Sequence, residues 1–228
     1  MRVSTVQTLA AYLDDEITAM PNLVTVGAAN TLTTVAGIPF YQGDTGSIYT
    51  HNVSGTDDTA TYNTAYGLTA LDAITTGDTN SAFGYAALGA NTTGAENTAM
   101  GKDALDANTT GSANVAIGLS SLGSNTTASD NIAIGVSTMF TNTTGASNVA
   151  VGKRALKFNT TASNNTAVGH DALTANTTGT ENVALGTEAL KANTTAIHNT
   201  AIGYRALYTH VTGNDNTAVG QEALYTNN

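Results

Sequence analysis

The ionisable side chains that could take part in catalysis or metal binding are few and scattered. The chain of 228 residues has 7 Lys and Arg, 17 Asp and Glu, 4 His and no Cys. The acidic runs 14–16 and 57–58 lack the spacing of a metal-binding loop, and Asp103 and Asp106 have no third group beside them. Catalysis needs convergent groups in one pocket. The sequence therefore predicts a protein that is not an enzyme, with no catalytic residue, metal or cofactor.

The histidines could also bind a metal or transfer a proton, but they lie far apart in the sequence, at His51, His170, His198 and His210. His210 is the most interesting of them, because it replaces an Asn that recurs through the chain. Three copies of one His around a threefold axis could hold a metal. A stacked or surface His is the favoured interpretation, since no metal-ligand spacing surrounds it.

Aromatic side chains beside cationic ones form two candidate receptor-binding groups. Exposed aromatics next to Arg suit contact with a glycan or a protein of a host surface, because they combine rigid area with a polar handle. The alternative is that Tyr is simply a good strand residue on a solvated face. The first group comprises Tyr204, Arg205, Tyr208 and Tyr225, and the second comprises Phe140, Lys153, Arg154, Lys157 and Phe158.

A strict repeat of seventeen residues must position these groups. Its pattern is N-[TVSI]-A-φ-G-x-x-A-L-x-x-N-T-T-G-x-x, where φ is apolar, and ten copies cover 63–228 without an insertion. A fixed period of this kind is the signature of a solenoid, in which each unit buries its apolar face against its neighbours. The Gly at position 5 marks the copies, at Gly67, Gly84, Gly101, Gly118, Gly135, Gly152, Gly169, Gly186, Gly203 and Gly220.

The composition of the repeat favours β-strands over helices. Gly at position 5 and N-T-T-G at positions 12–15 supply turns with positive φ, and the β-branched residues of V-A-I and T-T suit strands. Short strands between evenly spaced turn signals predict a mostly β fold, a parallel β-solenoid (β-roll) of ten coils. At a rise of ~4.8 Å per coil the shaft would be roughly 48 Å long. Asn residues at positions 1 and 12 would stack into ladders that hydrogen-bond along the axis.

The alternation of side chains along a strand predicts that the chain oligomerises. Position 3 is Ala in every copy and suits the interior of a narrow coil, which leaves positions 2 and 4 on the outer face. Position 4 is large and apolar, and soluble monomers rarely expose such a stripe. We expect identical chains to bury it around a shared axis, with a homotrimer favoured. The alternative is a wider monomeric coil with position 4 inside. The interface candidates are Met100, Ile117, Ile134, Val151, Val168, Leu185, Ile202 and Val219.

The repeat also resembles those of known fibrous proteins. N-V-A-I-G at 114–118 and N-V-A-V-G at 148–152 resemble the S-V-A-I-G core of trimeric autotransporter adhesin heads. The longer pattern N-T-A-x-G-x-x-A-L-x-x-N-T-T-G is similar to repeats of bacteriophage fibre proteins. The resemblance covers 63–228, although the adhesin repeat is shorter than seventeen residues. It implies a left-handed parallel β-roll of three chains around one axis.

Residues 1–62 are expected to attach the solenoid to another structure. Apolar residues with helical spacing predict an amphipathic helix over 1–20 that ends at Pro21, and acidic residues interrupt it too often for a signal peptide. Strand-like pieces between turns predict a small β-rich attachment or capping module over 21–62. The helix would dock on a virion or form a short coiled coil, or else pack on its own chain. Its apolar stripe, the candidate docking surface, is Val6, Leu9, Leu13 and Ile17.

Composition narrows the function. The formal charge of −10 disfavours nucleic-acid partners, which need a basic stripe, and no apolar run is long enough for membrane insertion. Every charged residue of the repeats occupies position 6, 7, 10, 16 or 17, so these positions are predicted to form solvent-facing edges.

Together with the resemblance, these features predict a structural fibre or decoration protein on the virion surface of a bacteriophage. Residues 1–62 would bind a virion structural protein, and the solenoid would project for adhesion and host recognition. The alternative is a fragment of a bacterial cell-surface adhesin. An ice-binding protein is less favoured, because adjacent Thr at positions 13 and 14 face opposite sides.

Overall fold

The described part of the chain is a solenoid. The computed structural model describes residues 34–35, 38–39, 41–42, 48–49 and 59–226. Over these residues the fold consists of strands and turns, with no helix. The helix expected over 1–20, with its docking stripe, lies outside the described residues, as does most of the module expected over 21–62.

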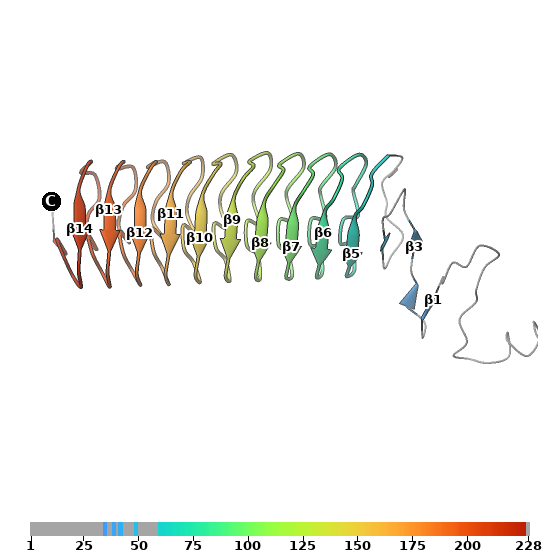
Figure 1. Cartoon of the computed structure of the whole chain (residues 1–228), viewed down its shortest axis with the longest axis horizontal. Helices are drawn as coiled ribbons and strands as arrows, with labels where there is room; N and C mark the ends of the chain where they lie inside the picture. The colour runs from blue at the N-terminus through green and yellow to red at the C-terminus, as the bar shows by residue number, and fades with distance from the viewer. Residues whose placement is uncertain (1–33, 36–37, 40, 43–47, 50–58, 227–228) are drawn as a thin grey trace, which may run out of the picture.

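Ten parallel strands, one from each repeat at positions 2–4, form a single sheet along the shaft (Figure 1). Each residue pairs with its equivalent seventeen positions later, as Ala133 does with Ala150. The predicted parallel β-solenoid is therefore confirmed. We call the repeats coils 1 to 10, starting from Asn63. The strands are β5 (Thr64–Tyr66), β6 (Ser81–Phe83), β7 (Thr98–Met100), β8 (Val115–Ile117), β9 (Ile132–Ile134), β10 (Val149–Val151), β11 (Thr166–Val168), β12 (Val183–Leu185), β13 (Thr200–Ile202) and β14 (Thr217–Val219).

Short strands that precede the repeats extend the same sheet. Strand β4 (Ile48–Tyr49) pairs in parallel with β5, and β3 (Tyr41–Gln42) pairs antiparallel with β4. Tyr49 is buried at this end of the core. Strands β1 (Thr34–Val35) and β2 (Ile38–Pro39) form a separate antiparallel pair. The sheet of the solenoid thus continues into the segment that was expected to cap it.

The interior of each coil is small and fully packed. Ala at position 3 and Leu at position 9 are buried throughout coils 1 to 9, with Met139 in place of one Leu. Position 4 lies on the outer face, where Met100 is 48% exposed and Leu185 is 46% exposed. The outward stripe is therefore confirmed, and the alternative of a wide coil with position 4 inside is wrong. An Ala column on the inner face leaves no room for larger side chains.

The T-T segment differs from the prediction, because it bends and forms no strand. The N–H and the Oγ1 of Thr109 both donate to the carbonyl of Thr126, at 2.9 and 3.0 Å. The two threonines stand between a buried Asn and a buried small residue, which leaves too short a segment for a strand. The N–H of the second Thr, Thr110, also donates to the Thr126 carbonyl, at 3.2 Å, but this residue is exposed.

Buried Asn ladders run through the coils at positions 1 and 12, as the sequence predicted. At position 1, Asn148 Nδ2 donates to Asn131 Oδ1 at 3.1 Å and to the Ala162 carbonyl at 2.9 Å. Its Oδ1 accepts the backbone N–H of Asn165 at 2.9 Å. At position 12, Asn108 Nδ2 donates to Asn91 Oδ1 at 2.9 Å. Each amide thus joins neighbouring coils and satisfies polar atoms that would be costly to bury unpaired.

The position-12 ladder is interrupted at His210, which is buried inside coil 9. Its Nε2 donates to the Gly213 carbonyl, which leaves Nδ1 as an acceptor in the neutral ring. Within the described residues, neither His210 Nδ1 nor Asn193 Oδ1 has a hydrogen-bond partner. The idea of a metal shared by three His210 side chains on an oligomer axis is therefore wrong, because the ring points into its own coil.

Replacing His210 with Asn is expected to stabilise the C-terminal coils. The new amide would donate to Asn193 Oδ1 and to the Gly213 carbonyl, as Asn176 does to its equivalents Asn159 Oδ1 and Gly179 O. A hydrogen bond to the buried, unpaired Asn193 Oδ1 should raise the free energy of unfolding by about 1–3 kcal/mol. Slower hydrogen exchange of the backbone amides of coils 8 and 9 would measure the gain.

The reverse change, Asn176→His, is the matched control because it creates the same interruption in the same ladder. The Asn176→His variant should show faster hydrogen exchange of the backbone amides in coils 6 to 8. Equal or faster exchange in the His210→Asn variant would contradict the prediction.

Candidate functional site

The candidate site lies along one edge of coils 6 to 10, at positions 7, 10 and 11. In coils 6 to 9, three residues per coil adopt a left-handed backbone, at positions 7, 9 and 17, as Arg154 (φ 61°) and Leu156 (φ 50°) do in coil 6. The sharp turns that result hold side chains of successive coils in columns about one strand spacing apart, ~4.8 Å. We call the resulting row of cations and rings the basic–aromatic edge: Arg154, Lys157, Phe158, Lys191, Arg205 and Tyr208.

An ion pair joins coils 6 and 7 in the position-7 column. The Arg154 guanidinium contacts Asp171 with two bonds, Nε to Oδ1 at 2.7 Å and Nη2 to Oδ2 at 2.6 Å. The Asp171 side chain is only 5% exposed. The prediction that position 7 forms a solvent-facing edge is therefore wrong for Asp171. The cause is the side chain of Arg154, which covers the carboxylate from the preceding coil.

A second cluster of charges joins coils 8 and 9. Glu188 accepts from Lys191 Nζ at 2.6 Å and from Arg205 Nε at 2.6 Å. The hydrogen bond from Lys191, followed by that from Arg205, lowers the pKa of Glu188, and the same contact with Glu188 raises the pKa of Lys191. A lowered carboxyl pKa contributes stability above the pKa of the unfolded state, and that stability is lost as the pH falls through the folded-state pKa.

The first aromatic group of the sequence analysis forms one cluster. The rings of Tyr208 and Tyr225 stack with centroids 5.0 Å apart and planes 8° from parallel. The Arg205 guanidinium lies 4.9 Å from the Tyr204 ring and 5.2 Å from the Tyr208 ring. Stacked rings with a cation over their faces form a rigid, amphipathic surface.

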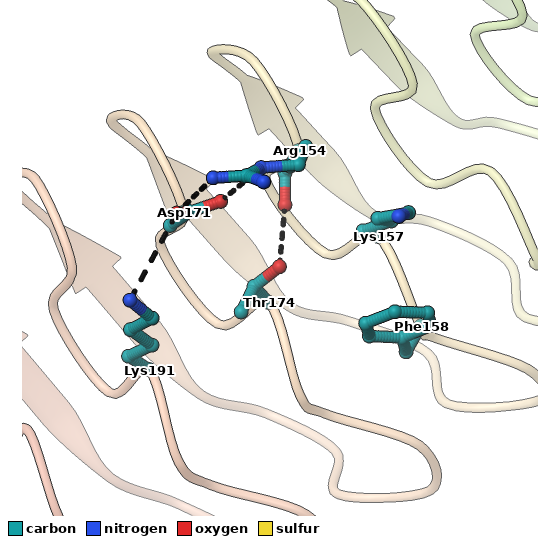
Figure 2. Close-up of a pocket in the computed structure, with 6 residues that line it drawn as sticks. All are labelled: Arg154, Lys157, Phe158, Asp171, Thr174 and Lys191. Carbon is teal, nitrogen blue, oxygen red and sulfur yellow. Dashed lines mark hydrogen bonds and ion pairs between the residues drawn. The ribbon is translucent and has the colours of Figure 1, made fainter.

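Three members of the second group line an open groove of about 230 Å³ (Figure 2). Figure 2 shows Phe158 and Lys191 on opposite sides of Thr174, with the Arg154–Asp171 pair along the rim. Phe140 and Lys153 belong to coils 5 and 6 but are not among the residues that line it, which are Arg154, Lys157, Phe158, Asp171, Thr174 and Lys191.

Two departures from the repeat create the groove. Position 10 carries Lys157, Thr174 and Lys191 in coils 6 to 8, so a short side chain stands between two long ones. Position 11 carries Ala, Ser or Thr in the other coils, and the ring of Phe158 therefore projects as a wall. Lys157 Nζ lies 4.7 Å from the centre of that ring.

Sequence reasoning missed four residues that connect the two groups: Asp171, Thr174, Glu188 and Lys191. Lys191 joins them, since its Nζ lies 3.9 Å from Asp171 Oδ2 and 5.5 Å from the Tyr208 ring. A usable signal was present, because opposite charges seventeen residues apart, such as Arg154 and Asp171, meet when coils stack in register. The two predicted groups are therefore parts of one edge.

The other candidates for chemistry form only small groups. His198 Nε2 lies 3.0 Å from Glu181 Oε2 and its Nδ1 lies 3.2 Å from Asp215 Oδ1. His170 Nδ1 lies 3.4 Å from Asp171 Oδ2. Burial, with a smaller effect of the Asp103 charge, raises the pKa of Asp106. Within the described part of the chain, no group of three or more His, Asp or Glu side chains could hold a metal. None of the described residues belongs to a helix that could cross a membrane.

The fold and this edge define the chain as a parallel β-solenoid with a basic–aromatic strip on one side. No protein-family model matches the chain, and neither the curated proteins nor the solved structures searched contain a match. Any assignment of function therefore depends on the geometry and on the likeness of the repeats described above.

Proposed function

We propose that this chain is a structural fibre or decoration protein of a bacteriophage virion. Residues 1–62 would attach it to a virion structural protein, and the solenoid would project to contact the host surface. The resemblance of the repeats to those of adhesin heads and phage fibres supports this proposal. The regular shaft suits a spacer, because each coil contacts only its neighbours and length is added one repeat at a time.

The observation that carries the proposal is the exposed apolar column on the outer face of the sheet. Position 4 presents Phe83, Met100, Ile134, Leu185 and Ile202 with exposed fractions between 36% and 48%. Leu68 and Tyr85, at position 6 of the first two coils, are also exposed. A continuous apolar face of this length favours burial against other copies of the chain.

A homotrimer around this face leaves the basic–aromatic edge available to a receptor. Residues at positions 7 and 10 follow the strand by a sharp turn, so they lie on a different side of the coil from position 4. Three copies would present three edges, and multivalent contact strengthens adhesion without any new contact per chain. A glycan or protein of the host surface is the proposed partner.

The proposal predicts a mass near three times 23.0 kDa for the full chain in light scattering. Antibodies raised against it should label the surface of intact phage particles in immunogold electron microscopy. A 23.0 kDa species, or particles without label, would contradict the proposal. Label on the surface of uninfected bacteria would favour the alternative, a bacterial cell-surface adhesin.

The double variant Ile134→Asp with Leu185→Asp tests whether the position-4 column is the interface between the copies. Both residues are exposed on the outer face, so the change should leave the coil intact while it places charges in the proposed interface. We expect a monomer with the circular dichroism spectrum of the unmodified chain. A variant that keeps the mass of the unmodified chain would place the interface elsewhere.

A further inference from the structure

We propose that the groove over coils 6 to 8 binds a carboxylated sugar ring, such as a uronic acid of a surface polysaccharide. The inference rests on the proposed role in adhesion, because it names the chemical class of receptor for that role. Lys157 would contact the carboxylate, Phe158 would pack against the ring, and Arg154 and Lys191 would donate to ring hydroxyls or to the carboxylate.

The charge of the groove favours an anionic ligand. Three cations and one carboxylate line it, whereas the whole chain carries a formal charge of −10. Asp171 already has Arg154 as its bidentate partner, so it is neutralised within the rim. The ion pairs of the described residues include Arg154 and Lys191 but not Lys157. Lys157 Nζ lies over the Phe158 ring but pairs with no carboxylate among the described residues, so it is the cation available to the carboxylate of a ligand.

The remaining donors of the rim are held in fixed positions. Asp171 takes two of the five N–H donors of the Arg154 guanidinium, and Glu188 takes one of the three of Lys191. Thr174 Oγ1 donates to the Arg154 carbonyl at 3.0 Å, which leaves its oxygen able to accept from a hydroxyl. Donors fixed before binding lose little conformational entropy when the ligand arrives.

The size and walls of the groove favour a single sugar ring. Its volume of about 230 Å³ is below the ~300–1,000 Å³ of drug-sized pockets. Phe158 is 46% exposed and offers an apolar wall for the carbon face of a ring. An extended acidic peptide or nucleic acid would need a longer groove and more unpaired cations.

Calorimetric titration of the full chain with a glucuronate oligosaccharide tests the inference. The carboxyl-reduced form of the same oligosaccharide is the ligand control. We expect binding of the acidic form that weakens with salt, and at least 10-fold weaker binding of the reduced form. Equal affinity for the two forms, or no binding of the acidic one, would overturn the inference.

Two variants locate the site. Lys157→Met removes the charge and keeps the length of the side chain, and Phe158→Ala installs the residue that Ala175 provides at the same position of coil 7. Each is expected to weaken binding about 10-fold. Lys102→Met is the control, since Lys102 is an exposed cation of coil 3 that does not line the groove. A loss of affinity of similar size in the control would indicate general charge attraction and would overturn the assignment of the binding site to the groove.

Competition with inorganic phosphate tests whether the groove binds anions in general. If phosphate displaces the oligosaccharide at a concentration similar to that of the oligosaccharide itself, the groove is a general anion site and the inference for sugars is wrong. The proposed function is tested separately by the labelling of particles. Uronate binding through Lys157 without particle labelling would overturn the virion proposal alone, and labelling without uronate binding would overturn this inference alone.

Discussion

Replacing Asn148 with Asp is expected to destabilise the solenoid by on the order of 4 kcal/mol at pH 7. Asn148 is fully buried in the position-1 ladder. Its Nδ2 faces three acceptors: Asn131 Oδ1 at 3.1 Å, the Ala146 carbonyl at 3.2 Å and the Ala162 carbonyl at 2.9 Å. The substitution has nearly the same shape but turns this donor into a charged acceptor without a partner.

The loss should depend on pH with a defined sign. Burial would raise the pKa of the introduced carboxyl in the folded state above its unfolded value. The penalty is therefore complete above the folded-state pKa and shrinks as the pH falls through it, because the protonated acid regains one donor. Denaturant unfolding of the variant and the unmodified chain at pH 7 and pH 4 should give a smaller difference at pH 4.

Asn164→Asp is the control. Asn164 lies one residue before the next ladder Asn, with the same amide and the same repeat, but it is exposed. Its replacement should change the free energy of unfolding by less than about 0.5 kcal/mol. If both variants lose the same stability, the ladder does not carry the stabilisation proposed for it.

Replacing Gly152 with Ala is expected to destabilise the shaft by about 3 kcal/mol or more. Gly152 has a φ of +132°, a backbone conformation that L side chains rarely adopt. An added Cβ would also lie 2.5 Å from the carbonyl oxygen of Gly169 in the next coil. Neither problem can be relieved by a rotamer change, because the obstructing atoms belong to the backbone.

Gly123→Ala provides the comparison. Its added Cβ would lie 3.4 Å from the Phe140 ring and 3.5 Å from the Ser120 carbonyl oxygen, which are ordinary contacts. Guanidinium unfolding should therefore place this variant near the unmodified chain, while Gly152→Ala unfolds at lower denaturant concentration. Similar midpoints for the two Ala variants would mean that coils can shift apart at position 5 without cost.

The repeat alone determined the architecture of the shaft. A period of seventeen without insertions requires equivalent residues to stack, and Ala at position 3 beside a large residue at position 4 assigned the inner and outer faces correctly. The Asn ladders followed from the same logic, because an Asn in every coil can bond to its own copy above and below. These inferences need only the chain direction and the alternation of side chains along a strand.

The tertiary structure decided how the turns place the variable residues. The burial of Asp171 beneath Arg154 and the link through Lys191 depend on turns with left-handed residues at positions 7 and 9. Non-Gly residues such as Leu156 reach that conformation only because the packed coil compensates its cost, so their sequence carries no local signal for it. The stacking of coils, which is a property of the whole chain, therefore created the groove and joined the two aromatic groups into one edge.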